Sequence, residues 1–455
     1  MRLYLILICL VAAAGGFLFG FDTSVISGAI EFIETPKVFN LNELEKGWTV
    51  SCIIIGCMAG CVFTGPLSDK YGRKLLLIAT ALIFLLSSLG CALAHSHSVF
   101  IINRIIAGFA VGSASMLAPV YIAEVSPAKH RGKLVSLNLF AIFLGQSAAF
   151  FSNFLLRNTG GVDNWRWMIG IQVIPSGILF LLLFFIPESP RWLVEKKKRS
   201  FALQILTKIN GKELAELDMA KIEESVHANV KGKLTELFKG KMFKLLLIGV
   251  ALAVFQQVTG INVIMYYAPS IFKSAGFGSD SALFQTALMG LVNLTFAVIS
   301  MFLIDKLGRK PLMVIGSIGM GISLLLLAIT FITNNFGGYF VLFCIIGFLA
   351  SFGFSLGPVV WVLIAEIFPN NLRSHAVAVS VFLLWTANFI VSFSFPYLLK
   401  NLQGYSFLIF SSMCFLCLVF VGKFLTETKG KSLEQIEKEL VGMDDPKMEI
   451  AVSEE

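Results

Sequence analysis

Runs of about 20 apolar residues recur along this 455-residue chain, and their recurrence limits the folds that it can adopt. An α-helix of this length crosses the hydrocarbon core of a bilayer. Charged residues are only 14% of the chain and hydrophobic residues are 56%, which excludes an ordinary soluble domain. The sequence therefore predicts an all-α polytopic membrane protein. Its twelve predicted transmembrane helices lie at about 3–28, 48–67, 75–94, 100–125, 134–156, 167–186, 244–272, 282–304, 311–331, 338–366, 375–399 and 405–425.

Lysine and arginine are concentrated in alternate loops. The basic loops lie between the second and third runs, the fourth and fifth, and the eighth and ninth, and the intervening loops carry few basic residues. The positive-inside rule places the basic loops and both termini on the cytoplasmic side of a cytoplasmic membrane. The net charge of +8 thus indicates topology and not a nucleic-acid partner.

Residues 187–243 interrupt the series of apolar runs. Ala202–Ile209 and Leu214–Val226 are short amphipathic stretches with Lys and Glu on their polar faces. They predict a cytoplasmic linker of short helices lying against the membrane face, and a flexible tether is the alternative. The linker separates two predicted six-helix bundles, 1–186 and 244–425. Residues 426–455 form a predicted cytoplasmic tail, which is acidic and poor in apolar residues after Leu440.

The two halves of the chain repeat each other. Asp69 and the following Gly-Arg-Lys recur as Asp305 and a second Gly-Arg-Lys. Glu124, Pro127 and Arg131 recur, at the same spacing, as Glu366, Pro369 and Arg373. Such a repeat predicts a duplicated six-helix unit whose parallel halves are related by an axis along the membrane normal, as in alternating-access transporters.

Polar side chains interrupt the apolar run between Gln256 and Pro269. The polar side chains here cannot form hydrogen bonds with lipid, so they must face protein, water or a ligand; they are those of Gln256, Gln257, Asn262, Tyr266 and Tyr267. Thr259 and Gly260 predict a locally loosened helix that turns the amides inward. Neutral amides and aromatic rings predict a site for an uncharged polyhydroxylated molecule, and hydrogen bonding between helices is the alternative. Further candidates for this cavity are Phe19, Gln146, Asn153, Asn293, Trp361, Trp385 and Asn388.

Two ionisable residues lie deep in the first half. Asp22 in the first run and Arg104 in the fourth are costly in hydrocarbon, and each is the other's obvious counter-ion. Protonation of Asp22 releases Arg104, which couples a proton to a conformational change. A static ion pair is the alternative.

Charged residues also lie at the helix ends near the basic loops. We expect them to form ion pairs between the two bundles that close the cytoplasmic side. The alternative for the loop at Asp69 is a basic loop that only sets membrane topology. This alternative explains the basic residues but not the Asp-Gly-Arg pattern or its second copy. The predicted gate residues are Asp69, Arg73, Glu124, Arg131, Glu188, Arg191, Asp305, Arg309, Glu366 and Arg373.

Several motifs together resemble the sugar porter family of the major facilitator superfamily, and in particular its bacterial proton-coupled xylose and other monosaccharide symporters. They include GGFLFGFDTSVISGA, GPLSDKYGRK, PESPRWL, QQVTGINVIMYYAP and GPVVWVLIAEIFPNNLR, and the resemblance covers about residues 12–437. It implies that Tyr267 closes over the sugar from outside and that Asp22 and Arg104 couple the proton. It also implies sugar contacts from Gln146, Gln256, Gln257, Asn262, Asn293, Trp361 and Trp385.

The sequence departs from the family pattern at informative positions. Facilitative relatives carry Asn where this chain has Asp22, so the carboxylate favours symport. Leu384 stands where xylose symporters carry Gln, which removes one hydroxyl contact.

The sequence as a whole predicts a monomeric importer of a monosaccharide with a proton, which works by alternating access. It is expected to need no cofactor other than the coupling proton, to bind no metal or nucleic acid, and not to be an enzyme. A facilitative uniporter, and a sugar or cyclitol sensor with a transporter-like fold, are the alternatives. The sequence does not define which sugar is carried.

Overall fold

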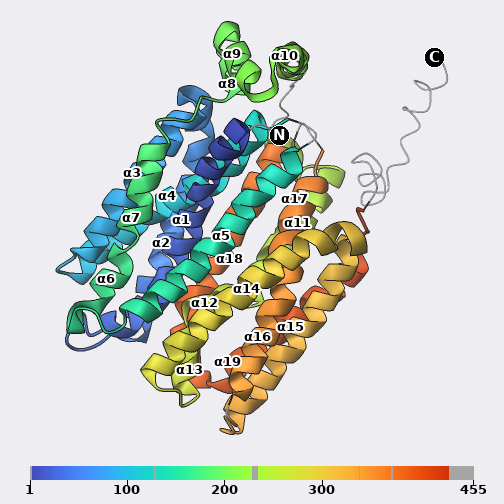
Figure 1. The fold of residues 1–455 in the computed structure, drawn as a ribbon. Coiled ribbons are helices and arrows are strands. Elements are labelled where there is room, and N and C mark those ends of the chain that lie inside the picture. Colours follow the sequence, from blue (N-terminus) through green and yellow to red (C-terminus); the bar gives the residue numbers. More distant parts are fainter. Residues whose placement is uncertain (1–2, 128–129, 228–233, 338, 370–371, 430–455) are drawn as a thin grey trace.

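The computed structural model describes residues 3–127, 130–227, 234–337, 339–369 and 372–429. Within this part of the chain, twelve helical segments are long and apolar enough to cross a membrane, so the predicted number is confirmed. The helices form two bundles that lie side by side, with the short linker helices at one end (Figure 1). We call that end the linker face and the opposite end the far face.

The first bundle holds the first six spans, the last of which is broken into two helices. Its helices are α1 (Leu3–Ile33), α2 (Glu43–Tyr71), α3 (Arg73–Ala92), α4 (His97–Val125), α5 (Arg131–Leu156), α6 (Asn164–Gly170) and α7 (Val173–Leu182), with a 3-10 turn at Gly161–Asp163.

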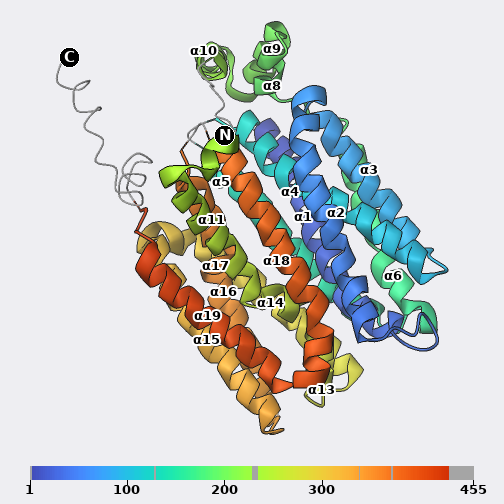
Figure 2. The same cartoon turned by 180° about the vertical axis from the view of Figure 1, so that it is seen from behind.

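The second bundle contains two further broken spans, and Figure 2 shows it from behind. Its helices are α11 (Gly240–Val258), α12 (Ile261–Tyr266), α13 (Ala268–Ser274), α14 (Ser279–Leu307), α15 (Arg309–Ile332), α16 (Phe340–Phe354), α17 (Leu356–Glu366), α18 (Arg373–Leu402) and α19 (Gly404–Phe424), with a 3-10 turn at Leu234–Phe238 before α11.

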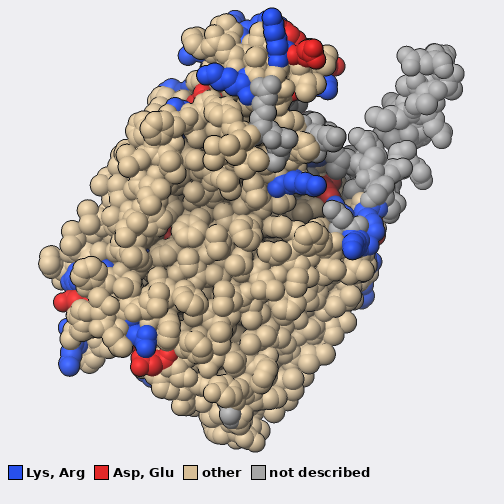
Figure 3. Space-filling view, viewed as in Figure 1, with Lys and Arg blue, Asp and Glu red and all other residues tan. Residues whose placement is uncertain are grey.

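Charged side chains gather near the two faces, and a broad uncharged belt separates them on the side shown in Figure 3. This distribution fits a bilayer, because lipid tails cannot solvate charge. Within the first bundle, glycines allow helices to approach closely. A Cβ at Gly108 of α4 would lie 1.9 Å from the Ile53 carbonyl oxygen of α2, so only glycine fits there.

The linker forms α8 (Pro190–Glu195), α9 (Arg199–Asn210) and α10 (Lys212–His227), which confirms the predicted short helices. Leu193, Ala202 and Leu206 pack with residues of α10 in a small core of their own. Trp192 Nε1 donates a hydrogen bond to the Asp69 carbonyl oxygen, 3.1 Å away, at the end of α2. The linker is thus fastened to the first bundle. Most of the predicted tail, from residue 430 on, lies outside the described residues.

Candidate functional site

The seventh span is interrupted where the sequence places its polar segment. α11 ends at Val258, and Gly260 adopts the left-handed region at φ 91° before α12 begins. A residue with a Cβ is disfavoured at such a φ, so glycine allows the sharp change of direction. The predicted loosening of the helix is confirmed.

Three amide side chains form a hydrogen-bonded chain beside this break. Asn262 Nδ2 donates to Gln257 Oε1 at 2.6 Å, and Gln257 Nε2 donates to Gln256 Oε1 at 3.2 Å. Gln256 Nε2 in turn donates to the carbonyl oxygens of Leu356 and Gly357, at 3.0 and 3.1 Å. Those carbonyls lie just after the break between α16 and α17, where the regular helical pattern is interrupted. The amides therefore stabilise two broken helices and fix each other's orientation.

Amides from the two bundles meet at the boundary between them. Asn293 Nδ2 of α14 donates to Gln146 Oε1 of α5 at 3.1 Å. Asn293 Oδ1 is buried and has no hydrogen-bond partner among the described residues. A buried acceptor of this kind is satisfied when a ligand hydroxyl or a water donates to it.

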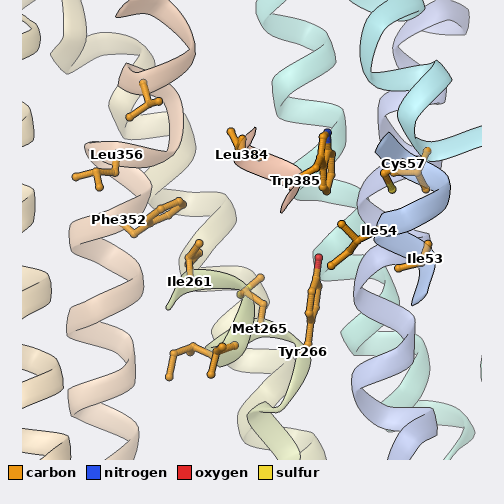
Figure 4. Packing of buried hydrophobic residues seen from close by; sticks show 14 of the residues in the cluster. Ile53, Ile54, Cys57, Ile261, Met265, Tyr266, Phe352, Leu356, Leu384 and Trp385 are labelled. Atoms are coloured by element: carbon orange, nitrogen blue, oxygen red, sulfur yellow. The ribbon is translucent and has the colours of Figure 1, made fainter. Parts of the chain in front are cut away.

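Aromatic rings also approach across the bundle boundary. The ring centroids of Phe19 in α1 and Trp385 in α18 are 6.1 Å apart. In Figure 4, Tyr266 and Trp385 extend toward Ile54 and Cys57 of α2. Although it lies in the polar segment, Tyr266 was not among the predicted site residues. Aromatic faces of this kind can stack on the C–H surface of a sugar ring.

The remaining predicted binding residues differ in their surroundings. Tyr267 is buried, and its hydroxyl donates to the Ser392 carbonyl oxygen at 2.8 Å. Asn388 Oδ1 accepts a hydrogen bond from the Ser392 hydroxyl at 2.9 Å. Trp361 is 38% exposed, more than any other predicted binding residue.

Asp22 and Arg104 form a buried ion pair within the first bundle. Arg104 Nη1 lies 2.6 Å from Asp22 Oδ1, and both side chains are at most 4% exposed. Gln172 Nε2 donates to the second carboxylate oxygen, Oδ2, at 3.0 Å. Arg104 Nε and Nη2 have no hydrogen-bond partner in the part of the chain that the structure describes. The pair is thus tightly held on the carboxylate side and incompletely satisfied on the guanidinium side.

Sequence reasoning missed Gln172. It lies at the break between α6 and α7, inside a span that the sequence predicts as one continuous helix. The signal was a lone glutamine in an apolar run, a few residues before Pro175. Such a residue indicates an unmet hydrogen bond but does not indicate its partner.

The charged residues at the linker face form matching contacts in each half. Arg73 Nη2 donates to Glu124 Oε1 at 3.0 Å in the first bundle. Arg309 Nη2 donates to Glu366 Oε1 at 2.9 Å in the second. The backbone N–H groups that begin α3 and α15 donate to the carboxylates of Glu188 and Glu427, respectively. Glu427 is therefore the second copy of Glu188, and the sequence analysis missed it.

The predicted ion pairs between the bundles stay a prediction, because the pairs described at this face do not join the bundles. Each described pair there lies within one bundle or within the linker, including Arg73 with Asp69 and Arg191 with Glu195. The helix order explains this, because a carboxylate that ends one helix lies beside the arginine that begins a neighbouring helix of the same bundle. The Asp305 side chain lies outside the described residues.

Two further predicted gate arginines bind carbonyl oxygens instead of carboxylates. Arg131 Nε donates to the Ala123 carbonyl oxygen at 3.1 Å, and Arg373 donates to that of Phe368. Cations are stabilised at helix C-terminal ends, where carbonyl groups lack partners inside the helix. Both arginines thus connect successive helices of one bundle.

We expect Glu427→Gln to lower the melting temperature of the purified protein by about 2 °C at pH 7. Burial alone would raise the pKa of Glu427, but the N–H groups of Arg309, Lys429 and Lys310 outweigh it and lower the pKa below the ordinary value. The carboxylate therefore stabilises the fold above the unfolded-state pKa of about 4.3, and this contribution is lost as the pH falls through the lower folded-state value.

The matched control is Glu188→Gln in the first half. Burial raises the pKa of Glu188 despite its backbone hydrogen bonds, so its ionised form is not favoured by folding. The melting temperature of Glu427→Gln should fall further below that of the native protein as the pH rises from 3 to 7. The melting temperature of Glu188→Gln should not. Equal pH dependence in both variants would contradict this assignment.

Comparison with known proteins agrees with this architecture. Residues 8–440 match the family model described as "Sugar (and other) transporter". The chain is 42% identical over 441 residues to the arabinose-proton symporter of Bacillus subtilis (strain 168), with 96% of this chain and 95% of that protein covered.

Solved structures match over nearly the whole chain. The xylose transporter XylE from E. coli in a partially occluded inward-open conformation matches with a TM-score of 0.85 and 38% identity, covering 95% of this chain and 100% of that chain. The major facilitator superfamily proton:xylose symporter XylE bound to 6-bromo-6-deoxy-D-glucose matches with a TM-score of 0.80 and 40% identity, covering 96% and 99%. The predicted major facilitator fold is confirmed, and the chain belongs to the sugar transporter family.

Proposed function

We propose that this protein imports a monosaccharide together with a proton by alternating access. The observation that carries the proposal is the buried Asp22–Arg104 pair, held within the bundle that supplies Gln146 to the site. A proton:xylose symporter and an arabinose-proton symporter are among the similar proteins, which supports both a sugar and a proton as the transported species.

The amide chain and the rings at the bundle boundary bind the sugar in this proposal. Amides offer both donors and acceptors to hydroxyl groups, and they carry no charge that would attract ions instead. The residues assigned to binding are Phe19, Gln146, Gln256, Gln257, Asn262, Tyr266, Asn293, Trp361, Trp385 and Asn388, with Tyr267 closing the site from the far face.

Proton binding at Asp22 drives the cycle. A neutral Asp22 no longer attracts Arg104 as an ion, which frees the buried guanidinium to find other partners. Gln172 orients the carboxylate and is a positioning residue. One charge crossing the membrane contributes about 2.3 kcal/mol per 100 mV, which is enough for roughly 50-fold accumulation of sugar. No cofactor is required, and one chain suffices.

We assign the protein to the cytoplasmic membrane and its linker face to the cytoplasm, since the basic loops lie at that face.

The structure is assigned to an inward-facing state. This assignment is supported by the described ion pairs that join the two bundles, all of which lie at the far face. They are Glu31–Lys273, Glu43–Lys400 and Arg157–Asp280.

Uptake of labelled xylose, arabinose, glucose, galactose and inositol into energised vesicles tests the proposal. At least one sugar should accumulate above equilibrium, and a protonophore should abolish that accumulation. Uptake that only equilibrates, with or without the protonophore, would instead identify a uniporter. If no sugar moves, the assignment of the amide site is wrong.

A further inference from the structure

A buried carboxylate lies at the far-face end of α1. Glu31 is 7% exposed, and its Oε2 lies 2.6 Å from Lys273 Nζ. Its other oxygen accepts a hydrogen bond from the Ser270 hydroxyl and lies 3.8 Å from Lys46 Nζ. We call Glu31, Lys46, Ser270 and Lys273 the far-face cluster. These residues are not used in the proposed sugar or proton sites.

The far-face cluster joins the two bundles. Glu31 and Lys46 belong to α1 and α2 of the first bundle, whereas Ser270 and Lys273 belong to α13 of the second. Lys46 Nζ also donates to Ser270 Oγ at 3.1 Å and lies 2.8 Å from Glu34 Oε2. Three contacts around Glu31 and Lys46 therefore cross the boundary between the bundles.

The cluster stands beside a cavity that opens at the far face. This cavity has a volume of about 430 Å³, and its lining includes Glu34, Lys46, Tyr267 and Ser270. Tyr267 is itself buried by its contacts with Ser392 and Phe395. The cluster thus lies where the bundles must part if the site is to open to the outside.

Burial distinguishes this cluster from the other ion pairs between the bundles. The Glu31 side chain is 4% exposed, and that of its partner Lys273 is 36% exposed. The other two pairs have no buried member, because Glu43 and Lys400 are 33% and 66% exposed and Arg157 and Asp280 are 24% and 71% exposed. Exposed pairs contribute little, because water solvates the charges whether or not they are paired. A buried charge that loses its partner is strongly destabilised unless water enters.

We propose that the far-face cluster is an ionic latch that holds the outside closed and sets the resting balance between inward-facing and outward-facing states. The proposal rests on the alternating-access function given above. When the bundles part at the far face, Glu31 must separate from Lys273 and Ser270, and its buried carboxylate must be hydrated anew. The latch thereby determines what fraction of the molecules can accept sugar from outside.

The latch affects apparent affinity without any contact to the sugar. The apparent dissociation constant equals the intrinsic constant divided by the fraction of molecules in the competent state. Weakening the latch should therefore improve the apparent affinity for sugar offered at the far face and weaken it for sugar offered at the linker face. A residue in the sugar site would change both in the same direction.

The test combines Lys273→Gln with a reporter, Ser27→Cys. Ser27 is fully buried and lies one turn before Glu31 on the same face of α1. A membrane-impermeant thiol reagent added at the far face should label Cys at this position about tenfold faster in the Lys273→Gln protein than in the reporter protein alone. The chain without the reporter corrects for labelling of the native cysteines. Sugar is left out, so the labelling rate tests the latch even if the proposed substrate class is wrong.

Lys400→Gln is the matched control, because it removes the same charge from an exposed pair between the bundles at the same face. It should leave the labelling rate within about twofold of the reporter protein. Combining Lys273→Gln with Glu31→Gln should increase the rate by less than the sum of the two single effects, since both substitutions remove the Glu31–Lys273 ion pair. An unchanged rate in Lys273→Gln, or an equal increase in Lys400→Gln, would overturn the latch.

If the reporter cysteine prevents folding, sugar affinity gives a second readout. The ratio of apparent affinities at the two faces, measured in right-side-out and inside-out vesicles, should shift about tenfold toward the far face in Lys273→Gln. A ratio equal to that of the native protein would contradict the proposal.

Discussion

Asp22→Asn is expected to abolish accumulation of sugar above equilibrium and to leave exchange of sugar across the membrane intact. Asparagine has nearly the same shape as aspartate, so the contact with Arg104 and the packing of α1 should persist. It cannot bind and release a proton near neutral pH, so the proton gradient no longer acts on the cycle. Accumulation should fall from roughly 50-fold per 100 mV to the equilibrium ratio.

Two assays in the same vesicles measure this effect. Energised uptake should stop at the equilibrium level, whereas counterflow of labelled sugar should proceed at a rate within several-fold of the native rate. Accumulation that persists in Asp22→Asn would show that another group couples the proton. Loss of counterflow as well would indicate that Asp22 is needed for the fold and not specifically for coupling.

Gln172→Leu is the matched control, because it removes a hydrogen bond to Asp22 without removing the carboxylate. Accumulation should persist. Because the hydrogen bond from Gln172 is made to the group that binds the proton, its loss should change the pH at which uptake is half-maximal. An unchanged pH profile would show that Gln172 has only a structural role.

Gln257→Ala is expected to weaken sugar affinity about 30-fold while the number of protons per sugar stays the same. The substitution removes an amide that we assign to sugar binding and leaves Asn262 Nδ2 and Gln256 Oε1 without their partner. Together these losses cost about 2 kcal/mol, which corresponds to this change in the dissociation constant. Binding of the transported sugar to purified protein, measured by calorimetry, gives the value directly.

Gln285→Ala controls for the loss of a buried amide. Gln285 is 4% exposed and belongs to α14 of the same bundle, but it takes no part in the amide chain. The Gln285→Ala protein should bind the transported sugar with the affinity of the native protein. If Gln257→Ala binds sugar as tightly as Gln285→Ala does, the amide chain holds the broken helices together and does not bind the sugar.

The features predicted well from sequence are those in which the chemistry of a few residues allows only one arrangement. Gly260 beside buried amides predicts a broken helix, because a regular helix could not turn both Gln256 and Asn262 inward. Asp22 and Arg104 are the ionisable residues deepest in their spans, so their contact follows from the cost of leaving either charge unpaired.

The features that sequence reasoning missed depend on how separate helices pack. The charges of Arg73 and Glu124 were identified, but periodicity cannot distinguish a contact within one bundle from a contact between bundles. Glu31 and Lys273 each look like ordinary charges at helix ends. They lie 242 residues apart in the sequence, and only the docking of the two bundles brings them into contact.

The linker's attachment also offers a way to observe the transport cycle. Because Trp192 is bound to the end of α2 and Glu188 to the start of α3, the three short helices should move with the first bundle as one rigid arm. A pair of spin labels, one on the exposed side of α9 and one at the linker-face end of α19, would then measure the rocking of one half against the other. The arm converts a small rotation inside the membrane into a larger change of distance in solution, where it can be recorded in real time.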